Sequence, residues 1–350
     1  MTSYALLVSP SANRVYAAAA PELTVAEIGV LGETVLRGRL ERVGRTALAG
    51  VSYVVLEGDL TGQDLAHVAN VSTALALFEL RGELLAPVAL HRLDRFDDDL
   101  LTILKYQGKT NELFTKLLLN VTVLSSAAAP RMLTDRLRVL DPMCGRGTTL
   151  NQTLMYGWHA AGVDVDERDV DAYAAFLPTW LKRKRLKHTA STAKLRRDGR
   201  TLGRRFQAEL AVDKEAWAAG ETLTVTVDHA DTAEAPHIFR AGSFDAVVTD
   251  APYGVQHGSR TGQQLRRSPV ELLTDVVPGW VELLRPGGAM GIAINTRVGS
   301  RADVLAVLAG SGLEPLDSEP YRRFEHRVDQ AIVRDIVVAV KPDPRTAPRV

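Results

Sequence analysis

One short segment restricts the fold of this chain more than any other. Residues 244–254 read Phe-Asp-Ala-Val-Val-Thr-Asp-Ala-Pro-Tyr-Gly, an apolar run that ends in an acid, a proline and an aromatic residue. A run of this composition is typical of a strand buried on both faces of a parallel sheet. Because open α/β sheets bind ligands beyond the carboxyl ends of their strands, we expect Asp250 and Tyr253 to project into a binding crevice.

The residues at the end of this strand have the chemistry to hold a flat base by its exocyclic amine. The carboxylate of Asp250 can accept one N–H and the carbonyl of Ala251 can accept the other. Tyr253, after the turn at Pro252, can stack on the ring, a contact worth roughly 1–3 kcal/mol. We therefore interpret these four residues as the catalytic group, with a plain strand ending in a proline-containing turn as the alternative.

A second motif lies upstream, at residues 138–150. Arg-Val-Leu-Asp-Pro-Met-Cys-Gly-Arg-Gly-Thr-Thr-Leu combines a short apolar strand, the acid Asp141 and a tight loop with Gly145 and Gly147. Thr148 is a residue type suited to open a helix, and glycines let the backbone approach a ligand without a Cβ. The segment has neither the third glycine of the dinucleotide fingerprint nor the Gly-Lys-Ser/Thr of a P-loop.

Together the two motifs resemble those of the THUMP-associated tRNA guanosine-N2 methyltransferases, which carry Asp-Pro-Phe-Cys-Gly-x-Gly-Thr and an Asp-Pro-Pro-Tyr signature. Met143 replaces the usual phenylalanine, and Ala251 replaces the first proline of the second motif. The resemblance implies an α/β fold over residues 101–340: a Rossmann-like class I methyltransferase domain with a seven-stranded, mostly parallel sheet. It also implies S-adenosylmethionine as cofactor and no metal.

The cofactor site that this resemblance implies draws on several segments. The stretch from Lys105 to Thr115 is expected to pack over the methionine end of the cofactor, with an ordinary helix start as the alternative. Asp164 lies 23 positions after Asp141, a spacing at which an acid meets a ribose hydroxyl, and Asp166 is the alternative. The expected cofactor-binding residues are Thr110, Thr115, Asp141, Met143, Cys144, Gly145, Gly147, Thr148, Asp164, Val165, Asp231, Thr232 and Asp250.

Two of the remaining assignments within this domain keep a structural alternative. By the resemblance, Asp231 would contact the adenine amine, although an acid that favours a turn is nearly as good an interpretation. His326 is interpreted as a structural hydrogen-bonding residue rather than a base. The loop at 254–260 is expected to act as a lid, and the last segment, 321–340, as the antiparallel hairpin that completes the sheet.

Residues 1–95 are expected to form a smaller α+β domain, compatible with the ferredoxin-like and THUMP-like front ends of this family. Its role stays open between positioning RNA, covering the site and dimerisation. The apolar patterns predict three strands, over 4–9, 47–56 and 84–93. They also predict two helices, over 21–40 and 64–80.

Charge and composition set limits on partners. The chain has 42 basic and 42 acidic residues, so any RNA binding must come from a local patch. One cysteine, no leader-like start and no apolar run of about 18 residues favour a cytoplasmic protein without a membrane partner. A basic insertion at 182–205 is the expected phosphate-binding patch, with a disordered or solubilising insertion as the alternative. The expected RNA contacts are Lys182, Arg183, Lys184, Arg185, Arg197 and Arg204.

These features predict an S-adenosylmethionine-dependent methyltransferase that acts on the exocyclic amine of a base, with guanosine N2 in tRNA as the expected target. A small-molecule N-methyltransferase of specialised metabolism is one alternative. A DNA amino-methyltransferase is another, although it would have to flip its target base and the chain has little room for a target-recognition domain. A cofactor-binding RNA clamp without turnover is the non-enzymatic alternative, and the oligomeric state stays open.

Overall fold

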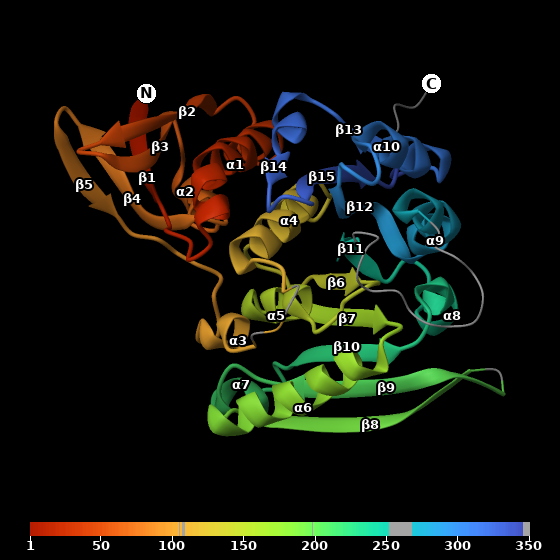
Figure 1. Ribbon diagram of the computed structural model, residues 1–350. Coiled ribbons are helices and arrows are strands. Elements are labelled where there is room, and N and C mark those ends of the chain that lie inside the picture. Colours follow the sequence, from red (N-terminus) through yellow and green to blue (C-terminus); the bar gives the residue numbers. More distant parts are fainter. Residues whose placement is uncertain (105, 107–108, 198, 252–267, 346–350) are drawn as a thin grey trace.

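The computed structural model describes residues 1–350 apart from 105, 107–108, 198, 252–267 and 346–350. Within these limits the chain forms a five-stranded sheet near its N-terminus and a ten-stranded sheet in the rest (Figure 1). The predicted lid at 254–260 lies outside the described residues.

The N-terminal unit has the βαββαβ order of ferredoxin-like folds, with one added edge strand. Its antiparallel sheet has the order β2-β3-β1-β4-β5. Its elements are β1 (Thr2–Val8), α1 (Arg14–Glu33), β2 (Leu40–Leu48), β3 (Val51–Gly58), α2 (Gly62–Val68), β4 (Ala74–Arg81) and β5 (Leu84–Val88).

Four of the predicted elements in this unit are wrong in extent or type, and one of them is the strand over 84–93, which ends at Val88. The helix predicted over 64–80 ends at Val68, and the strand β4 follows after a short turn. The single strand over 47–56 is a hairpin, because Ala49 and Gly50 adopt positive φ angles of 49° and 80° and turn the chain. The first helix starts earlier than predicted, since the Asn13 side chain accepts hydrogen bonds from the backbone of Val15 and Tyr16.

The second sheet confirms the predicted class I methyltransferase fold. Its strands follow the order β13-β15-β12-β11-β6-β7-β10-β9-β8. The five strands from β10 to β12 pair in parallel, and β15 runs antiparallel between β12 and β13. These seven strands are β6 (Arg138–Asp141), β7 (His159–Asp164), β10 (Leu223–His229), β11 (Phe244–Asp250), β12 (Leu284–Asn295), β13 (Glu314–Leu316) and β15 (Val333–Val340).

Helices cover both faces of this sheet (Figure 1). The longer ones are α4 (Glu112–Leu124), α5 (Thr148–Met155), α6 (Glu167–Arg183), α9 (Pro269–Leu283) and α10 (Arg301–Gly310). The shorter elements are α3 (Asp99–Thr102), η1 (Ala129–Arg131), α7 (Lys214–Ala218), η2 (Thr232–Glu234), α8 (Ala235–Ile238), η3 (Glu319–Arg323) and β14 (His326–Arg327). The described part of the basic insertion is a hairpin, β8 (His188–Arg197) and β9 (Arg200–Leu210), that extends the sheet beyond β10.

The two sheets share one hydrophobic core. A single cluster of buried side chains runs from Leu6 and Ile28 in the N-terminal unit to Leu117 and Ile336 in the second domain. Among the described residues, α1 alone is long and apolar enough to cross a membrane, and 56% of its apolar window is buried inside the protein. Because the buried cluster spans both parts, the N-terminal unit packs against the domain that carries the site.

A buried polar network reinforces this junction. The carboxyl of Glu27 in α1 accepts hydrogen bonds from the backbone and hydroxyl of Ser72, at 3.0 and 2.6 Å. The side-chain amide of Asn120 in α4 donates to the same carboxyl at 2.7 Å, and the Tyr156 hydroxyl donates to the oxygen of that amide at 2.8 Å. Buried polar groups that are all partnered in this way favour one packing arrangement over others.

We expect Glu27 to make the protein less stable as the pH rises. Burial raises the pKa of this carboxyl from an ordinary 4.5 to about 7, against opposing hydrogen bonds from Ser72 and Asn120. Below about pH 4.5 the Glu27 carboxyl is protonated in both the folded and the unfolded protein. Between about pH 4.5 and 7 it ionises in the unfolded protein but stays protonated in the folded one, so the free energy of unfolding falls as the pH rises. The loss amounts to about 3 kcal/mol by pH 8.

Urea unfolding of wild type and Glu27→Gln at several values between about pH 5 and pH 8 measures this effect. The variant should show a flatter dependence than wild type over this window. Asp141 has a pKa raised to the same range and keeps its own contribution in both proteins. Parallel curves for the two proteins would assign the pH dependence to other groups.

Candidate functional site

Four acids lie where the parallel strands end. Asp141 and Asp164 close β6 and β7, Asp250 closes β11, and Asp231 follows β10 by two residues. Since β10, β7, β6 and β11 are neighbours in the sheet and run in parallel, their carboxyl ends meet at one edge. The chain changes direction across the sheet between β6 and β11, which is where α/β folds place their binding crevice.

The glycine loop after β6 is fixed by carboxylates of neighbouring strands. Asp141 is buried and accepts a hydrogen bond from the backbone of Met143 at 3.2 Å, and burial raises its pKa to about 7. Asp164 accepts the backbone N–H of Gly145 at 2.6 Å and that of Asp166 at 2.8 Å. The pKa of Asp164 is raised, first by burial and then by the nearby acids. Both carboxylates therefore shape the loop.

Features around this loop fit the cofactor implied by the sequence. Gly147 caps α5 with φ of 78° and offers no side-chain hydrogen bond, so the first N–H groups of that helix lack a side-chain cap. Beside Asp164, Val165 is 49% exposed, which leaves an apolar face for a flat ring. The Thr232 hydroxyl after β10 is buried and has no hydrogen-bond partner among the described residues. Backbone donors, a carboxylate, an apolar face and a spare hydroxyl suit S-adenosylmethionine.

Tyr106 is a site residue that the sequence interpretation missed. Its hydroxyl lies 3.2 Å from that of Thr148, the first residue of α5. The guanidinium of Arg146 lies 4.8 Å from the centre of its ring and donates to Asp169 at 2.7 Å. The segment before α4 thus lies against the glycine loop. Its place in the stretch 105–115, which was expected to pack over the cofactor, was the available signal.

Asp250 is held by residues from two distant parts of the chain. The Thr110 hydroxyl donates to Asp250 Oδ2 at 2.6 Å, and Arg334 Nη2 donates to the same oxygen at 3.3 Å. Arg334 lies on β15, is 5% exposed, and stacks over the ring of Phe114 at 4.5 Å. The carboxylate is therefore positioned before any substrate binds. Arg334 carries no motif and was not anticipated from the sequence.

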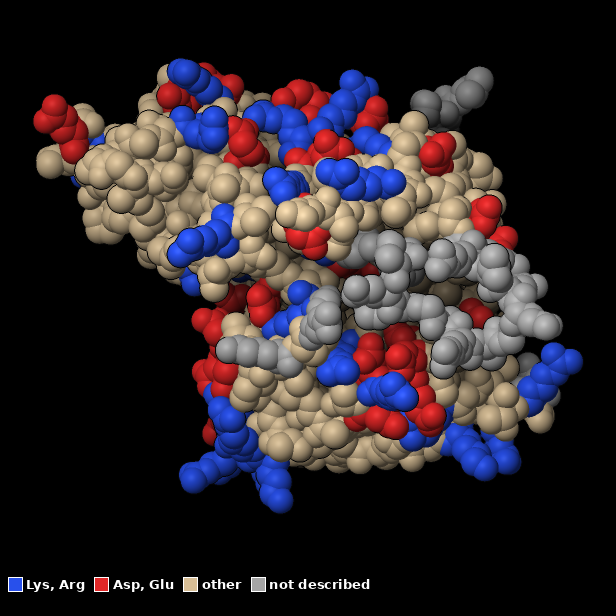
Figure 2. Space-filling view, viewed as in Figure 1, with Lys and Arg blue, Asp and Glu red and all other residues tan. Residues whose placement is uncertain are grey.

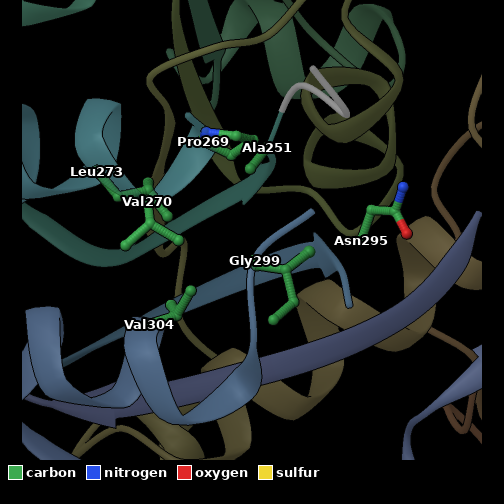
Figure 3. Close-up of a pocket in the computed structure, with 8 residues that line it drawn as sticks. Ala251, Pro269, Val270, Leu273, Asn295, Gly299 and Val304 are labelled. Carbon is green, nitrogen blue, oxygen red and sulfur yellow. The ribbon is translucent and has the colours of Figure 1, made fainter. Parts of the chain in front are cut away.

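Two hollows lie near the end of β11, one lined by Ala251 and the other by Thr110 and Arg334, the partners of Asp250. Thr110 and Arg334 line a cavity of about 280 Å³, whose other walls come from the start of α1 and from β14. Ala251 lines a much smaller one of about 10 Å³, with Val270, Asn295 and other residues shown in Figure 3. The smaller hollow holds about one water, so the larger one is the candidate substrate pocket.

Other expected site residues have different contacts. Thr115 is buried, and its hydroxyl donates to the Asn111 carbonyl within α4. Asp231 is exposed and accepts from the backbone of Ala233, which is the turn-forming role given as its alternative. Cys144 is buried, and burial raises the pKa of its thiol. Pro252 and Tyr253 lie outside the described residues.

The basic run divides between the two edges of the sheet. His229 at the site edge pairs with Arg204 in β9, so the hairpin tip extends beyond that edge, whereas His188 starts β8 at the opposite edge. Figure 2 shows basic side chains gathered at two separate corners, near the end of α6 and near the hairpin tip. The exposed members at the tip are Lys194, Arg196 and Arg200, and at the opposite edge Lys182, Arg183, Arg185 and Lys187.

Several of the expected RNA contacts are engaged within the protein. Arg183 pairs with Asp99 at 3.2 Å, and Lys184 pairs with Asp97 and Asp99 at 2.7 and 2.8 Å. Arg204 pairs with Asp171. The side chain of Arg197 lies outside the described part of the structure. Within the described residues, no group of three or more His, Cys, Asp or Glu is placed to hold a metal ion.

One family model matches part of the chain. Residues 131–285 match the family model of the RMKL-like methyltransferase domain. No curated protein is significantly similar in sequence.

Similar solved structures include three methyltransferases. A TehB-like SAM-dependent methyltransferase from Corynebacterium glutamicum is 14% identical, covers 61% of this chain and 84% of its own, and has a TM-score of 0.33. The 1,6-didemethyltoxoflavin-N1-methyltransferase from Burkholderia thailandensis is 15% identical, the match covers 63% of this chain and 77% of that protein, and the TM-score is 0.34. The geranyl diphosphate C-methyltransferase from Streptomyces coelicolor is 15% identical, the match covers 70% of this chain and 87% of that protein, and the TM-score is 0.34.

Proposed function

We propose that the chain, whose residues 131–285 match the family model of the RMKL-like methyltransferase domain, uses S-adenosylmethionine as methyl donor and methylates guanosine N2 in tRNA. The observation that carries the proposal is the placement of Asp250. Its carboxylate is held by Thr110 and Arg334, and both of these residues line the 280 Å³ cavity. An acid held in this way beside a pocket is suited to receive an amine N–H.

The chemistry requires the base amine, the methyl carbon and the departing sulfur to lie in line. S-adenosylmethionine supplies an electrophilic methyl group on a sulfonium. The contribution of the chain is mainly positioning, which can lower a barrier by roughly 7–11 kcal/mol. The glycine loop and Asp164 would hold the cofactor, and Asp250 would hold the target.

Asp250 also has an electronic role in this proposal. The lone pair of a base amine is delocalised into the ring, which makes the amine a weak nucleophile. Hydrogen bonds from its two N–H groups to Asp250 and to the Ala251 carbonyl favour a geometry in which that lone pair is localised. Positive charge that develops on nitrogen then faces a carboxylate already oriented by Thr110 and Arg334.

Transfer of labelled methyl groups from S-adenosylmethionine to unmodified tRNA, DNA and a metabolite pool tests the proposal. Nucleoside mass spectrometry then identifies the product. Recovery of N2-methylguanosine from tRNA is the expected result. Label found only in DNA or only among metabolites would reject the RNA assignment while leaving the methyltransferase site in place.

RNA contact is proposed to come from the hairpin tip. Its cations share the sheet edge with the site. In contrast, α6 is 17 residues long, so its last turn with Lys182, and Arg185 just after it, lie about 25 Å from that edge. We expect the triple variant Lys194→Ala, Arg196→Ala, Arg200→Ala to weaken tRNA binding. The slope of log affinity against log salt should fall by about 2, at roughly 0.7–0.9 for each phosphate that is no longer neutralised.

The matched control removes the same number of exposed cations from the opposite edge. Lys182→Ala, Arg185→Ala, Lys187→Ala changes net charge equally, so it reports the general electrostatic effect. Filter binding of tRNA at four salt concentrations compares the two triples. Equal weakening in both variants would mean that position on the sheet does not matter and that net charge alone attracts the RNA.

A further inference from the structure

Both parts of the chain contribute to the cavity of about 280 Å³. Ser11 and Asn13 line it from the N-terminal unit, and residues 109–112 and β14 line it from the second domain. Arg334, another lining residue, pairs in the sheet with Asn295 at the end of β12, so this part of the cavity lies at the site edge. Neither part of the chain forms the cavity alone.

Among the described residues, the charged groups that line the cavity leave one cation without an acidic partner. Lys109 Nζ pairs with Glu112 at 2.5 Å, and Arg334 pairs with Asp250 at 3.3 Å. Arg327 forms no ion pair within the described part of the chain, and its Nε donates to a backbone carbonyl at 3.0 Å. Because the Arg327 side chain is exposed, its outer nitrogens are available to a ligand that enters the cavity.

The polar side chains at the starts of two helices leave donors rather than acceptors for a ligand. The amide oxygens of Asn13 and Asn111 each accept two backbone N–H groups of their own helices, α1 and α4. The remaining amide NH₂ of Asn111 donates to the Ser11 hydroxyl oxygen at 3.2 Å. That oxygen also accepts from the backbone of Asn13 at 3.2 Å, so the hydroxyl hydrogen of Ser11 is left to donate.

We propose that this cavity binds a phosphate of the RNA strand beside the target nucleotide, with Arg327 as its cation and Ser11 as a neutral donor. A phosphate carries negative charge and several acceptor oxygens, which match one unpaired guanidinium and a set of donors. A volume of about 280 Å³ lies near the lower end of the roughly 300–1,000 Å³ of ligand pockets, which gives room for a phosphate and its sugar.

The residues that hold Asp250 connect this cavity to the proposed catalytic acid. Thr110 and Arg334 both line the cavity, and both donate to Asp250 Oδ2, at 2.6 and 3.3 Å. In RNA each base is joined through its sugar to a phosphate on either side, so a phosphate held in the cavity brings a neighbouring base towards Asp250. Phosphate contacts fix the position of a strand without reading its sequence.

This inference rests on the proposed function for the source of the phosphate. It also gives the N-terminal unit a role, because Ser11 and Asn13 of that unit complete the cavity. Of the roles that the sequence left open for the unit, the proposal selects the positioning of RNA.

Binding of unmodified tRNA to the full chain at four salt concentrations tests the proposal. Arg327→Gln should weaken binding by about tenfold or more, because it removes a charged donor to the phosphate. It should also lower the slope of log affinity against log salt by about 0.7–0.9, the value for one phosphate. Ser11→Ala should weaken binding by about two- to tenfold and leave the slope unchanged, since it removes a donor but no charge.

Arg37→Gln is the matched control. Arg37 is exposed, and its Nε donates to the Thr34 carbonyl at 2.9 Å, as the Arg327 Nε does to its own backbone acceptor. It follows the far end of α1, a helix of 20 residues, so it lies about 30 Å from the cavity. This variant should keep the wild-type affinity and salt slope. Equal losses in Arg37→Gln and Arg327→Gln would overturn the proposal.

Inorganic diphosphate separates RNA from a small phosphorylated substrate as the source of the phosphate. Calorimetry should show weaker diphosphate binding by Arg327→Gln than by wild type, in parallel with its weaker tRNA binding. Loss of diphosphate binding with an unchanged tRNA affinity would overturn the RNA assignment in favour of a small phosphorylated molecule. Binding of tRNA that depends on Arg327 and Ser11, without any N2-methylguanosine formed, would reject the proposed function and leave the phosphate site standing.

Discussion

Replacing Asp250 by alanine is expected to lower the methyl-transfer rate by about 10²–10³-fold or more, while S-adenosylmethionine binds within a few-fold of wild type. In the proposed function the carboxylate accepts the amine N–H and faces the charge that develops on nitrogen. Its contacts with Thr110 and Arg334 lie on the substrate side, towards the larger cavity. We expect cofactor binding to depend instead on the loop held by Asp164.

The fold must be checked beside the rate in this experiment. Asp250→Ala removes an ion-pair partner of Arg334, which is buried, and loss of a buried pair can destabilise a protein by about 3–5 kcal/mol. Asp250→Asn keeps an acceptor oxygen and similar volume, so it should fold like wild type and retain more activity than alanine. Calorimetry with S-adenosylmethionine and single-turnover rates are measured for both. Loss of cofactor binding in the asparagine variant would make Asp250 a structural residue.

A methyl group added at Gly147 is expected to disrupt the cofactor loop. A Cβ at this position would lie 2.4 Å from Cε2 of Tyr173, at a φ of 78° that side chains rarely adopt. Tyr173 is fully buried, its hydroxyl donates to Asn151 at 3.1 Å, and its ring packs against Phe206. Since the ring has no room to move away, the loop itself must shift.

Gly147→Ala should therefore lower stability by roughly 3 kcal/mol or more, from backbone strain of about 1–2 kcal/mol and overpacking of about 1–3 kcal/mol. Cofactor affinity should fall at least about tenfold, because that corresponds to only about 1.4 kcal/mol. Urea unfolding and calorimetric titration with S-adenosylmethionine measure the two effects.

Gly312→Ala separates strain from the clash. Gly312 has a similar φ of 86°, and a Cβ there meets nothing within 4 Å. This variant should show only the strain component and keep full cofactor affinity. The double variant Gly147→Ala, Tyr173→Leu should recover part of the affinity by making room beside the loop. If Gly147→Ala behaved like Gly312→Ala in both measurements, the steric argument would be wrong.

Local patterns were enough to predict the framework of the site. The apolar runs before Asp141 and Asp250 form buried parallel strands, and Asp164 ends the next strand and holds the glycine loop. These features depend on residue type and short spacing, which a sequence displays directly. The hairpin at Ala49 and Gly50 escaped prediction because its turn depends on two unusual backbone conformations within an otherwise continuous strand pattern.

Contacts between distant segments needed the folded chain. Thr110 was expected near the cofactor only through a family resemblance, and its bond to Asp250 spans 140 residues. Arg334, Tyr16 and His326 meet around one cavity although they come from opposite ends of the chain. No local pattern marks them, because only the packing of distant segments brings them together.

The basic run shows the same division between sequence and tertiary structure. By itself, the sequence determined that cations concentrate between residues 182 and 205, that the strand ends carry acids, and that a glycine loop follows the first of them. Only the tertiary structure decided that α6 and the β8–β9 hairpin carry these cations to opposite edges of the sheet. The physical reason is that charge and periodicity are properties of the local chain, whereas proximity to the site depends on which strands pair and in which direction they run.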